Sequence, residues 1–291
     1  SINLSDDAPV WVERLASTQA ADILTATSYY ADGRPTSRHS YWGVFFSESR
    51  NRIILNGGVG YTLTSSGNVL MDGFNILTDT YDPAGTFDDH PSFAHNIIGQ
   101  TMDLNTEDIY IFNGFVRYKW TTATNTWDGG TGSLIDGNGT TSMFDTLRNQ
   151  ILIVDGGTSK VFIFNIGTGI ETEITLTGPH VTTIMTLMTY FEYVPSLDLF
   201  VGRAEAAGGG VMTINPTTYV TGSLSTTGGG SIPEAQTVGV TVFTSGIYRK
   251  FLYCPELGGF IYSPAWDTNM WFFKTNDVEP PGPSKLVMVT K

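Results

Sequence analysis

The chain repeats one pattern of apolar and polar positions five times: an apolar segment, a polar five-residue turn and a second apolar segment. The turns occupy Ser47–Asn51, Asp103–Glu107, Asp145–Asn149, Val194–Asp198 and Cys254–Gly258. The segments after the turns are short and rich in β-branched and aromatic residues, which predicts strands. Successive turns start 56, 42, 49 and 60 residues apart. A period of about 50 residues with strand–turn–strand content is typical of the blades of a β-propeller.

We therefore predict an all-β chain that folds as a single β-propeller of five blades, each a four-stranded antiparallel sheet with its first strand along the central channel. The propeller is expected to span residues 1–275, followed by a Pro-rich C-terminal tail at 276–291. The third strand of the first blade is expected near Phe74–Tyr81, and only Val12–Ala26 shows a faint helical pattern. The blades are expected at about 39–90, 95–135, 141–177, 186–225 and 246–275.

The last blade lacks an outer strand in this scheme. We expect a strand from one terminus to complete it, because sharing a strand between the termini removes two exposed sheet edges. Residues 9–15 are the preferred candidate. Residues 285–290, which follow the stiff spacer Glu279–Pro283, are the alternative.

Paired glycines follow the second strand of two predicted blades, at Gly57-Gly58 and Gly156-Gly157. This pattern resembles the double-glycine signature of kelch repeats, and Thr124–Trp127 resembles the opening of their fourth strand. The resemblance to kelch and galactose-oxidase-like propellers covers most of the chain, although the fourth and fifth blades lack the glycine pair. That family includes enzymes, adhesion modules and scaffolds, so the resemblance implies a fold and no particular reaction.

Composition narrows the classes of partner. A net charge of −13 with dispersed basic residues argues against nucleic-acid binding, which needs clustered Lys and Arg. No apolar run approaches the roughly 20 residues of a membrane span, and no signal peptide is visible. The single cysteine, Cys254, excludes an internal disulfide. Charged residues make up only 15% of the chain, which favours a virion or extracellular surface over the cytoplasm.

The histidines occupy matched places in the repeats. His39 and His95 each lie eight residues before their turn, and His90 and His180 lie thirteen and fourteen residues before theirs. These segments lead from a rim strand to the next inner strand, so the side chains could converge at the channel mouth and bind a metal, a carboxylated sugar or a phosphate. Structural hydrogen bonds at matched blade positions are the preferred interpretation, and convergence on a ligand is the alternative. The candidate ligand-binding residues at this mouth are Arg38, His39, Tyr41, His90, His95 and His180.

One aromatic residue joins this set. Trp266, in the loop between the second and third strands of the last blade, is the best candidate to stack on a sugar, although Trp side chains also wedge between blades. No metal-ligand spacing, phosphate-binding loop or nucleophile motif is present, so we predict no metal and no cofactor, and the catalytic residues, if any, are unknown.

The leading functional hypothesis is a non-enzymatic propeller that binds a glycan or a protein, such as another virion subunit, on a viral, phage or cell surface. The alternative is a carbohydrate-active enzyme, either a polysaccharide lyase or a glycoside hydrolase, with its site at the channel mouth. A third hypothesis, a peptide-binding scaffold inside the cell, needs a basic face that the charge of −13 disfavours.

Overall fold

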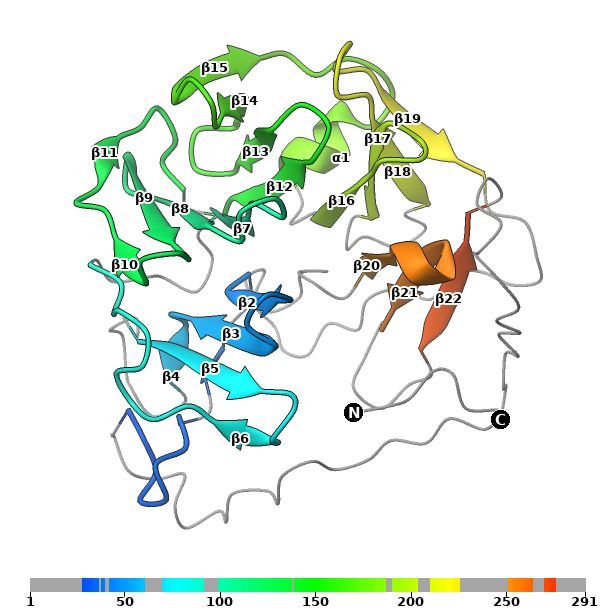
Figure 1. The fold of residues 1–291 in the computed structure, drawn as a ribbon. Coiled ribbons are helices and arrows are strands. Elements are labelled where there is room, and N and C mark those ends of the chain that lie inside the picture. The colour runs from blue at the N-terminus through cyan, green and yellow to red at the C-terminus, as the bar shows by residue number, and fades with distance from the viewer. Residues whose placement is uncertain are drawn as a thin grey trace.

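In the computed structural model, the strands form five antiparallel sheets around a common centre (Figure 1). The prediction of an all-β, five-bladed β-propeller is confirmed. In each sheet the first strand lies nearest the centre and later strands lie farther out (Figure 1). The structure describes residues 28–36, 38–39, 42–60, 70–91, 99–137, 139–186, 190–203, 210–225, 251–263 and 270–275.

The blades follow one another along the chain. Blade one contains β2 (Val44–Ser47), β3 (Arg52–Asn56), β5 (Met71–Asn75) and β6 (Thr80–Tyr81). Blade two contains β7 (Gly99–Met102), β8 (Ile109–Asn113), β9 (Val116–Thr121) and β10 (Thr126–Trp127), with β11 (Thr131–Gly132) also paired to β9. Blade three contains β12 (Thr141–Asp145), β13 (Gln150–Asp155), β14 (Lys160–Asn165) and β15 (Ile170–Ile174).

Blade four contains β16 (Tyr190–Val194), β17 (Leu199–Arg203), β18 (Val211–Ile214) and β19 (Thr221–Leu224). In blade five the described residues form β20 (Phe251–Cys254), β21 (Gly259–Tyr262) and β22 (Trp271–Lys274). Four further elements belong to the described structure: β1 (Arg38–His39) and β4 (Val59–Gly60), which form a separate two-stranded sheet, the helix α1 (Val181–Thr186) and the 3-10 turn η3 (Pro255–Leu257).

The repeated turns share a backbone conformation that explains why the pattern recurs. The fifth residue of each turn has a positive φ: 52° at Asn51, 60° at Glu107, 50° at Asn149, 49° at Asp198 and 59° at Gly258. Asn, Asp and Gly adopt this left-handed conformation most readily. One such residue therefore joins the first strand of each blade to the second.

Among the described residues, four apolar cores lie between successive blades, from blades one and two to blades four and five, because alternate side chains of a strand point to opposite faces of its sheet. In β12, Met143 packs with blade four while its neighbour Phe144 packs with blade two. Trp120, fully buried, lies in the core between blades one and two. Burial of one large apolar side chain stabilises the fold by about 1.5–3 kcal/mol, so these cores hold the ring together.

Two details of the sequence prediction are wrong. The segment Phe74–Tyr81 is not one strand: β5 ends at Asn75 and β6 begins at Thr80. The Asn75 Oδ1 accepts a hydrogen bond of 2.9 Å from the Leu77 amide, and this bond stabilises a turn between the two strands. The alternation of apolar residues gives no sign of this turn. The helix α1 was also not expected, because it is only one and a half turns long.

Several expectations lie outside the described residues. These are the closing strands at 9–15 and 285–290, the faint helical pattern at 12–26 and the Pro-rich tail at 276–291. The proposed division of the chain at residue 275 stays a prediction.

Candidate functional site

An aromatic side chain from blade one reaches the inner ends of blades four and five. Trp42, just before β2, is only 2% exposed. Its ring stacks on Tyr190, the first residue of β16, with centroids 5.3 Å apart and 25° between the planes. Blades one and four are not neighbours in a five-bladed ring, so this contact crosses the middle of the ring. We call this stacked pair and the residues around it the central cluster.

Charged groups belong to the central cluster as well. The Tyr190 hydroxyl donates a short hydrogen bond to the Glu192 carboxylate. Arg203, opposite Tyr190 in the β16–β17 register, is almost fully buried, and its guanidinium lies 4.6 Å from the ring centroid of Tyr262 in blade five. Such a cation–π contact stabilises a buried cation by about 1–2 kcal/mol. The central cluster therefore combines aromatic rings with the Glu192 carboxylate, bonded to Tyr190, and the Arg203 guanidinium, packed on Tyr262.

The sequence-predicted residues nearest to this cluster along the chain are in or beside β1. Arg38 and His39 form a two-stranded antiparallel pair with Gly60 and Val59. Tyr41, His95 and Trp266 lie outside the described residues. Whether these five residues bind a ligand stays a prediction.

His90 lies in the connection from blade one to blade two. It is 3% exposed, and its ring meets those of Tyr118 and Trp127 edge to face, with centroids 5.0 and 4.6 Å away. Both aromatic residues belong to the outer strands of blade two, so His90 lies away from the innermost strands. The same connection receives hydrogen bonds from Asn125 Nδ2 to the Thr86 carbonyl at 2.8 Å and from Trp127 Nε1 to the Asp88 carbonyl at 2.9 Å.

His180 occupies the corresponding place before blade four. Its Nε2 lies 2.6 Å from Ser223 Oγ, and its amide donates to Thr221 Oγ1 at 3.2 Å, both on the outer strand β19. Thr177 adds two backbone hydrogen bonds to the same strand region. Its amide donates a hydrogen bond to the Tyr219 carbonyl, and its carbonyl accepts one of 2.7 Å from the Thr221 amide. We call residues 86–90 and 177–180 the two straps. Each covers the outer strand of the blade that it precedes, and the structure places His90 and His180 in different straps.

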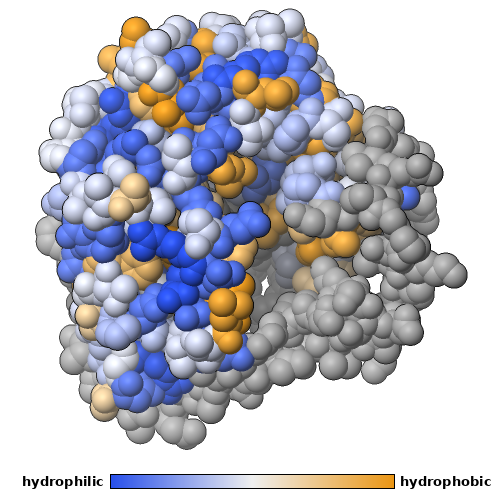
Figure 2. Space-filling model, viewed as in Figure 1, coloured by the Kyte–Doolittle hydropathy of each residue, from blue (hydrophilic) through white to orange (hydrophobic). Residues whose placement is uncertain are grey.

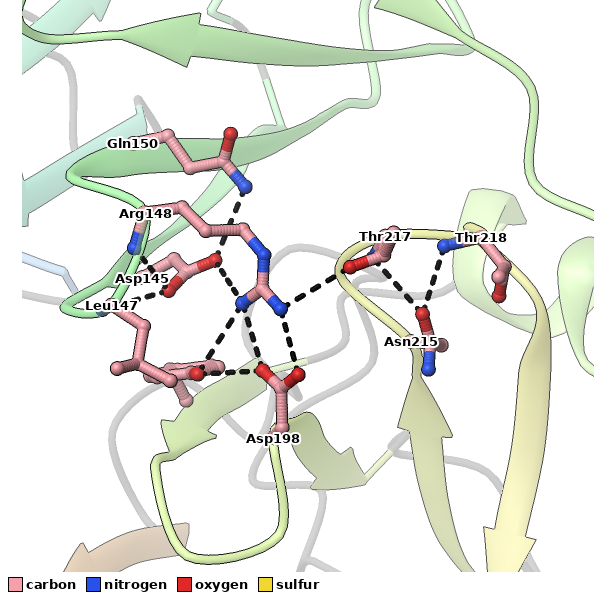
Figure 3. A network of polar contacts seen from close by, with 9 residues as sticks. Asp145, Leu147, Arg148, Gln150, Asp198, Asn215, Thr217 and Thr218 are labelled. Carbon is pink, nitrogen blue, oxygen red and sulfur yellow. Dashed lines mark hydrogen bonds and ion pairs between the residues drawn. The ribbon is translucent and has the colours of Figure 1, made fainter.

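A polar network joins blades three and four at the end of the blades that carries the repeated turns (Figure 3). Arg148, from the turn of blade three, donates two parallel hydrogen bonds of 2.8 and 2.7 Å to the Asp198 carboxylate in the turn of blade four. It also donates to buried Asp145 at 3.0 Å and to Thr217 Oγ1 at 3.2 Å. Two-point Arg–carboxylate pairs are the strongest and most directional ion pairs in proteins.

The network shifts the ionisation of its members. Hydrogen bonds from Arg148 and then from Tyr193 hold the pKa of Asp198 below its usual value. The same ion pair raises the pKa of Arg148. Burial, and then the bond to Asp198, raises the pKa of the Tyr193 hydroxyl above its usual value. Arg148 and Asp198 are thus both charged and serve as a link between blades, which we call the 3–4 clamp.

A second link joins blades one and two at the same end. The Glu107 carboxylate, in the turn of blade two, accepts hydrogen bonds from Ser47 Oγ at 2.5 Å and from the amide and hydroxyl of Ser49 at 2.9 and 2.5 Å. Burial acts to raise the pKa of Glu107, but these hydrogen bonds outweigh it and lower the pKa overall. Arg50, one turn position before Asn51, donates to the Thr122 carbonyl of blade two. We call these contacts the 1–2 clamp.

Sequence reasoning missed the clamps and the central cluster, although a signal for the clamps exists. The fourth turn position holds Arg50 and Arg148 in blades one and three. The fifth position holds Glu107 and Asp198 in blades two and four. The alternation of a basic and an acidic turn predicts pairing between neighbouring blades once the turns are known to lie at one end of the ring. Trp42 carries no comparable signal.

In the described part of the chain, no three or more His, Cys, Asp or Glu side chains are grouped so that they could hold a metal ion. None of the helices in that part has the length and apolarity needed to cross a membrane.

Many solved structures are similar to this chain, including two from Bacteroides species. The chain matches no protein-family model, and no curated protein matches it. One structure, a protein of unknown function from Bacteroides thetaiotaomicron, is 15% identical with a TM-score of 0.42; the match covers 65% of this chain and 44% of that one. The other, a "putative 6-phosphogluconolactonase" from Bacteroides uniformis, is 13% identical with a TM-score of 0.49; the match covers 82% of this chain and 67% of that one.

This chain therefore spans less than half of the length of the first structure. Sequence identities and TM-scores this low assign neither a family nor an activity to this chain.

Proposed function

We propose that the protein is a non-enzymatic, kelch-like propeller that binds another macromolecule through its outer surface. The observation that carries this proposal is the central cluster. Trp42, Tyr190, Arg203 and Tyr262 are all at least nine-tenths buried, and their contacts join blade one to blade four and blade four to blade five, so these side chains support a packed centre over an open catalytic site.

The clamps support the same proposal. At the end of the blades that carries the repeated turns, which we call the turn face, Arg148, Asp198 and Glu107 are committed to links between blades. A group already held in such a pair acts poorly as an acid or base, since its pKa is moved away from neutrality. The pairs instead fix the relative positions of the turns, which gives a binding surface little conformational entropy to lose.

Apolar side chains are exposed on the turn face. Leu77, Leu104 and Leu147 are each more than half exposed and lie in turns that join the first and second, or the third and fourth, strands of a blade. On the face that Figure 2 shows, apolar residues form small separate patches among hydrophilic ones. Rigid apolar points in a polar surround are typical of protein and glycan recognition surfaces.

The proposed partner is a glycan or a protein, and the proposed place is a virion or an extracellular surface. The net charge of −13 supports this choice over nucleic acid, whose phosphates would be repelled. Paired glycines such as Gly57 and Gly58, with φ of 62° and 100°, support the kelch-like type, because the signature needs residues without a side chain there.

The test is a binding screen against glycans and polysaccharides, run beside an assay for products released from the same polysaccharides. We expect the wild type to release no product. Binding that Leu104→Ser/Leu147→Ser loses and His39→Ala/His95→Ala keeps would place recognition on the turn face. Product release by the wild type would overturn the proposal in favour of a polysaccharide lyase or a glycoside hydrolase. The absence of both binding and product would favour a protein partner.

A further inference from the structure

The hairpin between β8 and β9 in blade two holds a bulky residue in an unfavourable backbone conformation. Its two loop residues, Gly114 and Phe115, have φ of 59° and 62°, and the flanking residues Asn113 and Val116 are paired. Two successive positive φ values are those of a type I′ turn, which strongly prefers Asn or Gly. Phenylalanine at such a position is a true outlier, because its Cβ crowds the backbone.

The Phe115 side chain recovers little of this cost by burial. It is 52% exposed, although an aromatic ring of this size would normally be turned into a core. Leu134 is 57% exposed and lies between the two residues whose backbones bond to Phe115. We call Phe115 and Leu134 the blade-two knob. Phe115 thus combines backbone strain with an exposed apolar side chain that gains little from packing. We infer that this side chain contacts a binding partner.

The knob is held rigidly. The Phe115 amide donates to the Ile135 carbonyl at 3.1 Å, and the Phe115 carbonyl accepts the Ser133 amide at 2.8 Å. The Leu134 amide donates to the Glu171 carboxylate of blade three at 2.6 Å. Glu171 is itself fixed by an ion pair of 2.9 Å with Arg117. Two neighbouring blades therefore fix both apolar residues of the knob, so little conformational freedom would be lost on binding.

We propose that the blade-two knob is the anchor through which this protein binds a partner protein that offers an apolar socket rimmed by neutral or basic side chains. The proposal rests on the binding function proposed above and names a protein as the partner, but it places the anchor at the opposite end of the blades from the turn face, because the hairpin between β8 and β9 joins the second and third strands. The knob is thus a second contact point, separate from Leu104 and Leu147. The socket follows from the paired exposed apolar residues, since buried aromatic anchors dominate the energy of protein interfaces. The rim follows from the net charge of −13, which repels an acidic partner and a second copy of this chain alike.

The first test is stability. Asn tolerates a positive φ, so Phe115→Asn should relieve the strain and raise Tm by about 2–4 °C. Leu147→Asn is the matched control, because Leu147 is a similarly exposed apolar turn residue that is absent from the residues with positive φ. This variant should leave Tm unchanged within about 1 °C. A fall in Tm for Phe115→Asn would show that the ring is needed for folding and would overturn the proposal.

The second test uses β-cyclodextrin, a small ring with an apolar cavity, as a soluble socket. In an NMR titration of the full chain, amide shifts should move at Phe115 and Leu134 and should be lost in Phe115→Asn. Shifts that persist in this variant, or that appear only elsewhere, would overturn the proposal. Neither test involves catalysis. Product release in the polysaccharide assay would therefore overturn the proposed function without contradicting the proposal that the knob is a binding surface.

Discussion

At the scale of single residues, the fifth turn position carries two demands at once. Its backbone needs a residue that tolerates positive φ, which Asn51, Asn149 and Gly258 meet without strain. Glu107 and Asp198 adopt the same conformation and add a carboxylate that reaches the preceding blade. Glu is the less suited of the two to this backbone, so the contact that it makes offsets a local cost.

Glu107→Gln should show what that contact contributes. The folded pKa of Glu107 is lowered, so its stabilisation is fully present above its usual value of 4.5 and is lost as the pH falls through the lowered pKa. At pH 7 we expect the variant to lose about 1–2 kcal/mol of unfolding free energy, measured by urea titration. Well below the lowered pKa of Glu107 the loss should vanish, because the wild-type side chain is then neutral as well.

Glu48→Gln is the control for this measurement. Glu48 lies in the facing turn and is exposed, so its variant should match the wild type at both pH values. A loss for Glu107→Gln that does not change with pH would mean that side-chain packing, and no charge, is at work.

At the scale of elements, the straps explain the matched histidines. The connection from blade one to blade two and that from blade three to blade four both return over an outer strand, β10 and β19 respectively. An outer strand otherwise exposes a row of unpaired backbone groups, which invites aggregation. His90 and His180 lie at the ends of these straps, so their similar spacing from the turns, thirteen and fourteen residues, reflects a shared path of the chain.

The second strap depends on a glycine. Gly178 has φ of 104°, and a Cβ there would lie 2.6 Å from the Thr221 carbonyl oxygen. Gly178→Ala should therefore destabilise the fold by about 1–3 kcal/mol and speed hydrogen exchange of the Thr221 amide. Gly129→Ala is the control, because a Cβ at Gly129 meets nothing within 4 Å. Equal exchange rates in the two variants would show that the strap does not protect β19.

At the scale of the whole molecule, Trp42 links parts of the ring that are far apart in sequence. It precedes blade one, yet its packing partners belong to blades four and five. Contacts of this separation form only after the intervening chain has folded, since loop closure costs entropy. The central cluster should therefore make unfolding of the five blades more cooperative.

Trp42→Ala should cost about 3–5 kcal/mol of unfolding free energy in urea and lower the m-value as blades lose their coupling. Trp271→Ala provides the comparison, because Trp271 is 38% exposed at the start of β22. We expect it to cost less than half as much. Equal losses in the two variants would place Trp42 among ordinary partly buried side chains.

The sequence alone was enough to predict the class of fold and most strands. The strands Lys160–Asn165, Leu199–Arg203 and Val211–Ile214 each contain a run of apolar residues rich in β-formers, which the sequence displays directly. The contacts between blades were beyond its reach. Arg148 and Asp198 are 50 residues apart, and only the closed ring brings their turns together. Likewise, His90 and His180 lie at similar distances in the sequence from the turns that follow them, but these distances do not show which strand each side chain contacts.

The two clamps also have a consequence for the number of blades in the ring. Going round the ring, the fourth and fifth turn positions hold a base in blade one, an acid in blade two, a base in blade three and an acid in blade four, and in blade five they are the uncharged Leu257 and Gly258. A ring with an odd number of members cannot alternate two kinds of partner without one mismatch. The uncharged pair of positions in blade five lies where that mismatch would fall, between the acid of blade four and the base of blade one. A variant ring that gains or loses blades should therefore keep its pairing only if it changes by two at a time.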